Sequence, residues 1–233
     1  MNQFARTEML IGAGAMERLA GARVAVFGVG GVGGHCAEAL VRAGVGHIEL
    51  IDNDTVSLTN LNRQIVALHS TLGRPKVEVM AERLRDVNPQ AEVVCHPLFY
   101  LPETADAIDL SRFDYVVDAV DTVAAKLELI VRTDALGVPL ICAMGAGNKL
   151  DPTRIVITDI YKTDTCPLAR VIRAQCKRRQ IRRLKVAYST EPALKPAPLP
   201  DAAGRTPPGS MSFVPSAMGL IIAGEVIREL ISR

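Results

Sequence analysis

The feature that most constrains the fold is a glycine-rich run, GVGGVGG at residues 28–34, that directly follows an apolar stretch at residues 22–27. The uninterrupted apolar stretch predicts a strand buried on both faces, and the residues after the glycines predict a helix to about Ala43. This order suits phosphate binding, because glycine lets the backbone approach a phosphate and the helix N-terminus offers free N–H groups. We therefore expect a nucleotide to bind at Gly28, Gly30, Gly31 and Gly33.

The alternation of strand and helix patterns continues along the chain. Buried-strand patterns end at Asp52, Asp118 and Ala143, with helical patterns between them and a shorter helical stretch near 103–110. Before the first strand, residues 8–20 predict one short helix. This rhythm predicts an α/β fold built on a doubly wound, Rossmann-like, mostly parallel sheet.

The pattern changes after Asp151. The remaining chain predicts a strand, a basic helix from about Pro167 to Arg183, a strand near 185–189, a proline-rich loop at 191–210 and a C-terminal helix at about 216–231. Six of the 14 prolines fall in the loop, and the sequence leaves its conformation open.

A polar segment after the second strand narrows the choice of nucleotide. Asp52 ends that strand, at the place where an acid binds ribose hydroxyls. The following run contains residues that a dinucleotide site does not need, namely Asp54, Asn60, Arg63 and Gln64. A guanidinium such as that of Arg63 can hold a triphosphate in bidentate fashion, and Lys76 at the start of the next helix adds a second cation.

A second acidic motif, DAVD at residues 118–121, begins where the strand predicted at residues 115–118 ends. The carboxyl ends of parallel strands share one edge of the sheet, so a carboxylate there suits Mg²⁺ beside the phosphates. Cations, a metal ion and fixed acids around a triphosphate are what nucleotidyl transfer requires. An NAD-linked binding protein, the alternative for a glycine-rich turn, has no use for Arg63, Lys76 and Asp121 together.

In this order and spacing the motifs resemble a known superfamily. The patterns GxGGxG, DxDxVxxxNxNRQ, GxxK and DAxD, within about residues 4–145, are similar to the adenylyltransferases that include the ubiquitin-activating enzymes and the activators of the molybdopterin and thiamin sulfur carriers. Segments at 4–12, 151–153, 188–191 and 209–215 are most similar to the tRNA threonylcarbamoyladenosine dehydratases. The resemblance implies that residues 1–150 form an ATP-binding adenylation core and that residues 151–233 extend the same domain.

The resemblance also implies roles for single residues. Gly31 would approach the phosphates, Asp52 would bind the ATP ribose, and Asp121 would bind Mg²⁺. Asn60, Arg63 and Lys76 would hold the triphosphate. Arg6 matches an arginine that reaches across a two-fold axis into the ATP site of the other subunit, so the resemblance implies a homodimer. The expected catalytic residues are therefore Arg63, Asp121 and Arg6.

The five cysteines depart from the superfamily pattern. Sulfur-carrier and ubiquitin-like activators usually carry two CxxC pairs that bind Zn²⁺, and this sequence has no CxxC pair, so we expect no structural zinc. Scattered cysteines indicate reduced thiols and, with no secretory signal visible, a cytoplasmic location; no segment reads as a membrane span. Cys166 is a possible thioester-forming residue, but we interpret it as a partly buried thiol.

The charge of the chain is unevenly distributed. Residues 151–233 contain 14 Lys and Arg against 7 Asp and Glu, whereas the whole chain has a net charge of +2. No acid interrupts the segment from Arg170 to Lys185, although a solvated helix face normally mixes both signs. We predict that this segment contacts nucleic-acid phosphates. Its basic residues are Arg170, Arg173, Lys177, Arg178, Arg179, Arg182, Arg183 and Lys185.

These expectations combine into one function and one alternative. The resemblance implies ATP-dependent adenylation of the threonylcarbamoyl carboxylate on a tRNA adenosine, followed by ring closure with net loss of water. Capture within the same modification needs no enzyme nucleophile, because an intramolecular reaction has a high effective molarity. The alternative is adenylation of the C-terminal glycine of a ubiquitin-like sulfur-carrier protein. Binding of a monovalent cation, help from a cysteine-desulfurase-type partner, and the choice of tRNAs stay open.

Overall fold

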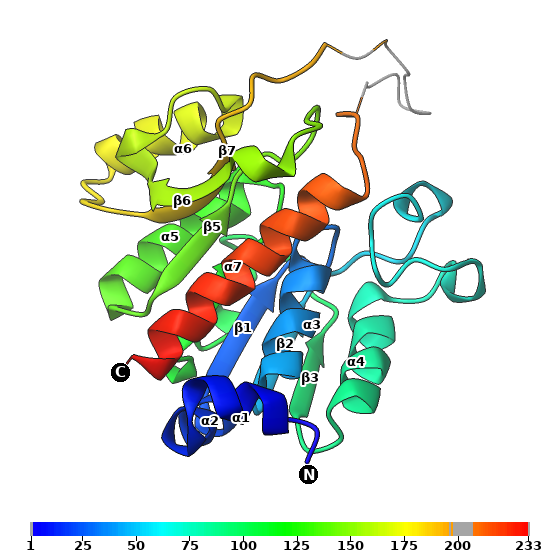
Figure 1. Ribbon diagram of the computed structural model, residues 1–233. Helices are drawn as coiled ribbons and strands as arrows, with labels where there is room; N and C mark the ends of the chain where they lie inside the picture. Colours follow the sequence, from blue (N-terminus) through cyan, green and yellow to red (C-terminus); the bar gives the residue numbers. More distant parts are fainter. Residues whose placement is uncertain (1, 196, 198–206, 233) are drawn as a thin grey trace.

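The computed structural model describes residues 2–195, 197 and 207–232, and its described strands form one seven-stranded sheet (Figure 1). Their order is β3-β2-β1-β4-β5-β7-β6, and all neighbours are parallel except β7 and β6. The strands are β1 (Arg23–Phe27), β2 (His47–Ile51), β3 (Glu92–His96), β4 (Tyr115–Asp118), β5 (Leu140–Ala143), β6 (Ile155–Asp159) and β7 (Lys185–Ser189). The predicted doubly wound, mostly parallel sheet is confirmed.

Alternate residues of the central strand β1 face two different layers of the core. Val24 and Val26 pack on the side covered by α3 (Gly33–Ala43), α4 (Lys76–Val87) and α7 (Phe213–Ile231). Ala25 and Phe27 face the opposite side, where α5 (Val123–Leu136) and α6 (Pro167–Arg178) lie. Both faces of β1 are buried, which explains why residues 22–27 show no alternation of apolar and polar residues.

The parallel strands give the sheet two distinct edges. We call the edge at which β1, β2, β4, β5 and β7 end the carboxyl edge, and the opposite one the amino edge. The N-terminal helices α1 (Ala5–Ile11) and α2 (Ala13–Gly21) lie at the amino edge (Figure 1). The functional residues predicted in the loops after the strands therefore lie at the other end of the molecule from α1.

Two predicted helices in the first half of the chain are wrong in detail. Residues 8–20 form parts of two helices, because Gly12 takes a φ of 81° and ends α1. Residues 103–110 form no α-helix but contribute to two 3₁₀ turns, Ala105–Ala107 and Leu110–Arg112. Asp109 accepts a hydrogen bond from the Ser111 N–H at 3.0 Å, so its side chain starts the second turn and competes with a continuous helix.

The basic helix is also shorter than predicted. It ends at Arg178 instead of near Arg183, because Gln180 takes a φ of 59° and the Ile181 N–H donates to the Cys176 carbonyl at 3.1 Å. Ile181 and Leu184 are buried and hold the following turn on the core. At the other end of this region, α7 starts at Phe213, slightly before the predicted 216. No helix in the described ranges has the length and apolarity needed to cross a bilayer.

Candidate active site

A cavity of about 450 Å³ opens at the carboxyl edge, among the loops that follow β1, β2 and β4. The predicted nucleotide-binding residues that line it are Gly28, Gly30, Gly31, Asp52, Asp54, Asn60, Arg63, Gln64, Lys76 and Asp121. The structure therefore brings together residues from four separate segments of the chain. Gly33 does not line the cavity.

Two glycines of the first loop are required by close backbone contacts. Gly28 has a φ of 87°, and a Cβ placed on it would lie 2.7 Å from the carbonyl oxygen of Ala119. A Cβ on Gly33 would lie 1.8 Å from the carbonyl oxygen of Gly28, so no side chain fits where α3 starts. Gly33 thus shapes the turn, while Gly30 and Gly31 present backbone directly to the cavity.

Asp52 ties the end of β2 to the glycine loop. Its Oδ2 accepts a hydrogen bond from the Val29 N–H at 2.7 Å, and its Oδ1 accepts one from the Asp54 N–H at 2.8 Å. Burial raises the pKa of this carboxyl above its usual range, although those hydrogen bonds and Lys76 work in the opposite direction. Asp52 is held rigidly in the position where an acid would accept ribose hydroxyls.

The ammonium of Lys76 is held at the cavity by an ion pair. Lys76 is the first residue of α4 and is only 5% exposed. Its Nζ lies 2.7 Å from Oδ2 of Asp54, whose carboxylate is exposed. A buried ammonium with one exposed acidic partner is oriented and can still attract a phosphate in the cavity.

The segment between β2 and α4 orients three further side chains. Asn60 is buried, and its Oδ1 accepts the Ser57 N–H at 3.0 Å, so it shapes the local 3₁₀ turn. Arg63 Nη1 donates to the Thr59 carbonyl at 3.0 Å, and the guanidinium forms no ion pair within the described ranges. Gln64 is buried, and its Oε1 has no hydrogen-bond partner among the described residues. An orphaned polar atom beside an uncompensated guanidinium fits a cavity that binds a polar ligand.

Asp121 follows β4 and carries an exposed carboxylate at the same cavity. The described residues contain no group of three or more His, Cys, Asp or Glu side chains that could hold a metal ion. Mg²⁺ usually keeps several waters and is bound by one or two carboxylates together with substrate phosphates. A single accessible carboxylate beside a phosphate site therefore fits Mg²⁺ that arrives with a nucleotide.

One wall of the cavity was not predicted from the sequence. Pro207, Pro208 and Ser210, from the far end of the proline-rich segment, line it. Asn148, at a φ of 58°, holds this wall, because it exchanges two hydrogen bonds of 2.7 Å with Gly209. The resemblance at residues 209–215 was the available signal, and it carried no information on where the segment lies.

The sequence model of the ThiF family matches residues 4–233. The chain belongs to the ThiF family. A tRNA threonylcarbamoyladenosine dehydratase of Bacillus subtilis is 43% identical over 242 residues, which cover 99% of this chain and 95% of that protein. The structure of the Escherichia coli tRNA N6-threonylcarbamoyladenosine dehydratase in complex with ATP has a TM-score of 0.89 and 34% identity, and the match covers 99% of this chain and 94% of that one. The same enzyme in complex with AMP gives a TM-score of 0.90.

Arg6, which the resemblance to ThiF-family enzymes placed at an ATP site, does not line the cavity of its own chain. It belongs to α1 at the amino edge, whereas the cavity lies at the carboxyl edge (Figure 1). Met9 and Leu10, on the same short helix, are 87% and 85% exposed. A role for Arg6 at an ATP site therefore requires a second chain.

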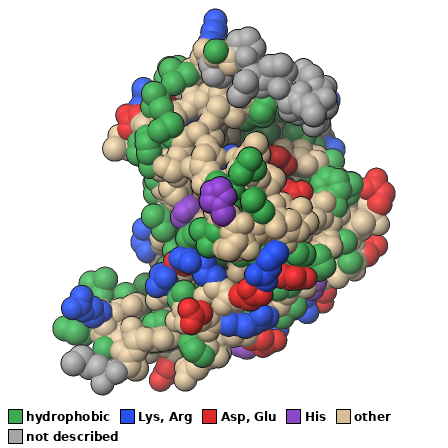
Figure 2. All heavy atoms as spheres, turned by 90° about the vertical axis from the view of Figure 1, so that its right-hand side faces the viewer, with side chains coloured by type: hydrophobic (Ala, Val, Ile, Leu, Met, Phe, Trp, Pro, Cys, Tyr) green, Lys and Arg blue, Asp and Glu red, His purple; other side chains and the backbone are tan. Residues whose placement is uncertain are grey.

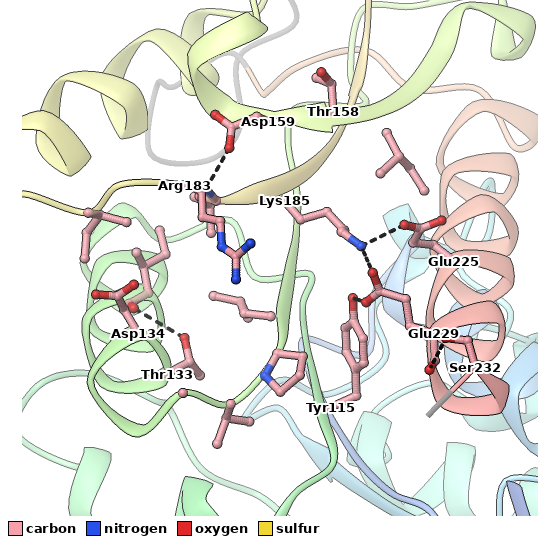
Figure 3. Close-up of a pocket in the computed structure, with 18 residues that line it drawn as sticks. Tyr115, Thr133, Asp134, Thr158, Asp159, Arg183, Lys185, Glu225, Glu229 and Ser232 are labelled. Carbon is pink, nitrogen blue, oxygen red and sulfur yellow. Dashed lines mark hydrogen bonds and ion pairs between the residues drawn. The ribbon is translucent and has the colours of Figure 1, made fainter. Parts of the chain in front are cut away.

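The basic segment from Arg170 to Lys185 is only partly available to a ligand. Lys185 was predicted to bind nucleic acid, but it points into a second cavity and is paired there with Glu225 at 2.7 Å and with Glu229 (Figure 3). Arg173 Nη1 donates to the Thr163 carbonyl at 2.7 Å and is half-buried. The exposed members are Arg170, Lys177, Arg178, Arg179, Arg182 and Arg183.

Cys166 lies at the start of α6 and is 3% exposed. Its Sγ accepts the Ala169 N–H at 3.5 Å, so the thiol caps the helix instead of facing the cavity surface. This burial makes Cys166 a poor thioester-forming residue.

Proposed function

We propose that this chain is an ATP-dependent tRNA threonylcarbamoyladenosine dehydratase. The observation that carries the proposal is the match along nearly the full length to the Bacillus subtilis dehydratase, together with the cavity of polar residues at the carboxyl edge. The structural match to the Escherichia coli dehydratase in complex with ATP supports a nucleotide as the ligand of that cavity. The chain is then an enzyme that uses ATP to remove water from a modified tRNA adenosine.

In this proposal each part of the ATP molecule contacts different residues of the cavity. The backbone at Gly30 and Gly31 approaches the phosphates, and Asp52 accepts the ribose hydroxyls. Arg63 and Lys76 neutralise the triphosphate, and Asn60 fixes the segment that carries Arg63. Gln64 contributes its Oε1, which has no partner among the described residues, to the binding of the nucleotide. Mg²⁺ would be held by Asp121, and when bound it supplies positive charge beside the phosphates.

The chemistry needs no nucleophile from the protein. Transfer of AMP to the threonylcarbamoyl carboxylate releases pyrophosphate and gives that carboxyl group a good leaving group. A nitrogen of the same modification then attacks the activated carbonyl carbon, AMP leaves, and the ring closes. Because both reacting groups belong to one nucleoside, the effective molarity is high. The buried Cys166 is consistent with this route.

We propose a homodimer in which Arg6 of one chain serves the ATP site of the other. The amino-edge position of α1 and the exposed Met9 and Leu10 beside Arg6 support an interface there. Mixing Arg6→Ala chains with Arg63→Ala chains would leave one hybrid site with both arginines. That mixture should recover part of the activity that each variant lacks alone, and absence of recovery would mean that Arg6 acts within its own chain or not at all.

We propose that the tRNA phosphates contact the exposed basic residues of α6 and the turn after it. The surface near α4 is different, because cations and acids are mixed there (Figure 2) and form pairs such as Arg83 with Glu38 at 2.5 Å. The exposed arginines after Cys176 have no acidic neighbours in sequence before Glu191. Such a stretch without acids suits the phosphate backbone of a nucleic acid.

The deciding experiment is incubation of the full chain with ATP, Mg²⁺ and tRNA that carries the threonylcarbamoyl modification. Nucleoside mass spectrometry should show the modified adenosine losing the mass of one water, with AMP formed in equal amount. Omission of ATP is the control. If pyrophosphate is released only when a ubiquitin-like sulfur-carrier protein is added, and the nucleoside keeps its mass, the alternative function is correct and the dehydratase proposal is wrong.

A further inference from the structure

A fully buried ion pair lies beside the nucleotide cavity. Asp118 is the last residue of β4, Lys126 belongs to α5, and both side chains have 0% exposure. Lys126 Nζ lies 3.0 Å from Oδ1 and 3.1 Å from Oδ2 of Asp118, and it also donates to the Ala143 carbonyl at 2.8 Å. One ammonium therefore joins the carboxyl ends of β4 and β5 to helix α5.

The two residues of this ion pair flank, in the sequence, the loop that carries Asp121. Asp118 precedes residues 119–122 and Lys126 follows them. Oδ1 of Asp118 also accepts the Val120 N–H at 3.2 Å, so the carboxylate holds the loop backbone as well as the ammonium. On the other side, the Ala119 N–H donates to the Phe27 carbonyl at 2.8 Å, and Ala119 packs against Gly28. The loop is thus fixed between the glycine turn and the ion pair.

Stability alone is a weak reason to keep such a pair. Removing two charges from water costs several kcal/mol for each ion, and apolar residues of similar volume often replace a buried pair without loss of stability. Asp121, by contrast, has little to hold it: among the described residues its side chain accepts one hydrogen bond, from Thr122 Oγ1 at 3.4 Å. The position of its carboxylate therefore depends on the backbone of the loop.

We infer that Asp118 and Lys126 are positioning residues for Asp121. Their ion pair fixes loop 119–122 so that the Asp121 carboxylate faces the metal ion and the triphosphate. Neither residue lines the nucleotide cavity. The inference rests on the proposed ATP site and adds to it a pair of residues that set the affinity for the divalent cation.

Two double variants, here called neutral pairs, replace both charged residues by uncharged ones and test the inference. Asp118→Leu with Lys126→Met removes both charges at similar volume, and Asp118→Asn with Lys126→Gln keeps polar groups. Binding of Mn²⁺ in the presence of a non-hydrolysable ATP analogue, followed by electron paramagnetic resonance, should weaken at least about tenfold in each, as when the support of a metal ligand is removed. The Mg²⁺ concentration for half-maximal AMP formation should rise by a similar factor. ATP binding in EDTA should change less than about twofold, because the ATP contacts themselves remain. The single variant Lys126→Arg, which keeps the charge, should retain most of the Mn²⁺ affinity of the wild type.

The matched control is a second ion pair away from the cavity. Glu49 is 6% exposed and pairs with Arg112 and with His96, whose Nε2 lies 2.6 Å from Oε2 of Glu49, so Glu49→Gln with Arg112→Met removes charges from a comparably buried acid. This control should bind Mn²⁺ as the wild type does. Wild-type Mn²⁺ affinity in a folded neutral pair would overturn the inference. Failure of both neutral pairs to fold would also overturn it, because the ion pair would then serve stability. A wild-type chain that forms no AMP with ATP and modified tRNA would instead remove the proposed function, and the inference with it.

Discussion

The two cavities at opposite edges of the sheet both contain cations and carboxylates, but they use them differently. At the carboxyl edge, Arg63 has no acidic partner among the described residues and Lys76 has one exposed partner, Asp54. At the amino edge, a larger cavity of about 840 Å³ contains Lys185, whose ammonium is already paired with Glu225 and Glu229 (Figure 3). Glu229 also accepts a hydrogen bond of 2.7 Å from the Tyr115 hydroxyl.

The comparison indicates how a binding site can be identified. Whether charged side chains already have partners within the protein is more informative than the volume of the cavity. At the amino edge, the charges of Lys185, Glu225 and Glu229 satisfy one another, join β7 to α7 and contribute to the fold. Arg183 also lines that cavity and has no ion pair among the described residues, but the glycine-rich turn lines only the carboxyl-edge cavity. Charges that lack internal partners remain available to a ligand, and an uncompensated cation near a helix start is suited to phosphates. The smaller cavity is therefore the better candidate for ATP.

The largest expected effect is the difference in activity between two variants, each of which removes one cation from one of the two cavities. Arg63→Ala should lower kcat/KM for ATP-dependent AMP formation by about 100-fold or more, since it removes donors from the charge that develops on the triphosphate. Lys185→Met should change kcat/KM less than about twofold, because its charge is neutralised within the fold. Steady-state kinetics with modified tRNA measure both values.

Thermal unfolding supplies the control for this pair. Arg63→Ala should keep the wild-type Tm, because Arg63 forms no ion pair in the described part of the chain. Equal losses of activity in the two variants would contradict the comparison, since they would mean that the amino-edge cavity also takes part in the reaction.

An effect of intermediate size is expected on tRNA binding by the basic residues of α6 and the turn after it. Replacing Arg178, Arg179, Arg182 and Arg183 by Gln should weaken tRNA binding, and the slope of log affinity against log salt should fall by about 0.9 for each phosphate that the variant no longer neutralises. Lys185→Gln should leave that slope unchanged, since Lys185 is paired internally. Affinity measured by filter binding over a range of KCl concentrations provides the test. An unchanged slope in the fourfold variant would mean that these arginines are merely solvated.

The sequence predicted what depends on neighbouring residues and missed what depends on distant ones. The β1 strand, the glycine turn and α3 follow from about 20 consecutive residues with a strong local pattern, and the structure has them as predicted. The internal pairing of Lys185 could not be predicted, because Glu225 and Glu229 lie 40 and 44 residues further along the chain. A basic run shows how many cations are present but not which of them already have partners.

The cavity at the carboxyl edge shows the same limit of prediction from sequence. Loops after parallel strands must meet at one edge, so the grouping of Asp52, Arg63, Lys76 and Asp121 could be predicted from topology alone. The wall formed by Pro207 and Pro208 could not, because it depends on how a long segment returns to Asn148. Similarly, nothing local distinguishes Asp118, which is buried, from Asp121, which is exposed.

The smallest expected effect is on the pH dependence of stability, and it has opposite signs in the two cavities. The hydrogen bond from Lys185 is the main cause that lowers the pKa of Glu225 below its ordinary value of 4.5. A lowered pKa stabilises the fold above that value, and this contribution is lost as the pH falls through the pKa of the folded state. Lys185→Met should therefore lower Tm at pH 7 by about 2–4 °C, as expected for a pair worth about 1 kcal/mol in a chain of this size, and by less near pH 3.

Asp52 should behave in the opposite way, because burial raises the pKa of its carboxyl above the ordinary 3.8. Its contribution is present below that value and is lost as the pH rises through the higher pKa of the folded state, where the ionised group carries a desolvation cost. The Tm of Asp52→Asn relative to that of the wild type should therefore rise between pH 3 and pH 7, while the loss of one of the two hydrogen bonds from backbone N–H groups lowers the Tm of the variant at every pH. Calorimetry of both variants between pH 3 and pH 7 measures these trends. If the Tm differences of Asp52→Asn and Lys185→Met from the wild type changed in the same direction between pH 3 and pH 7, the carboxylates of the two cavities would not differ in how burial and ion pairing affect them.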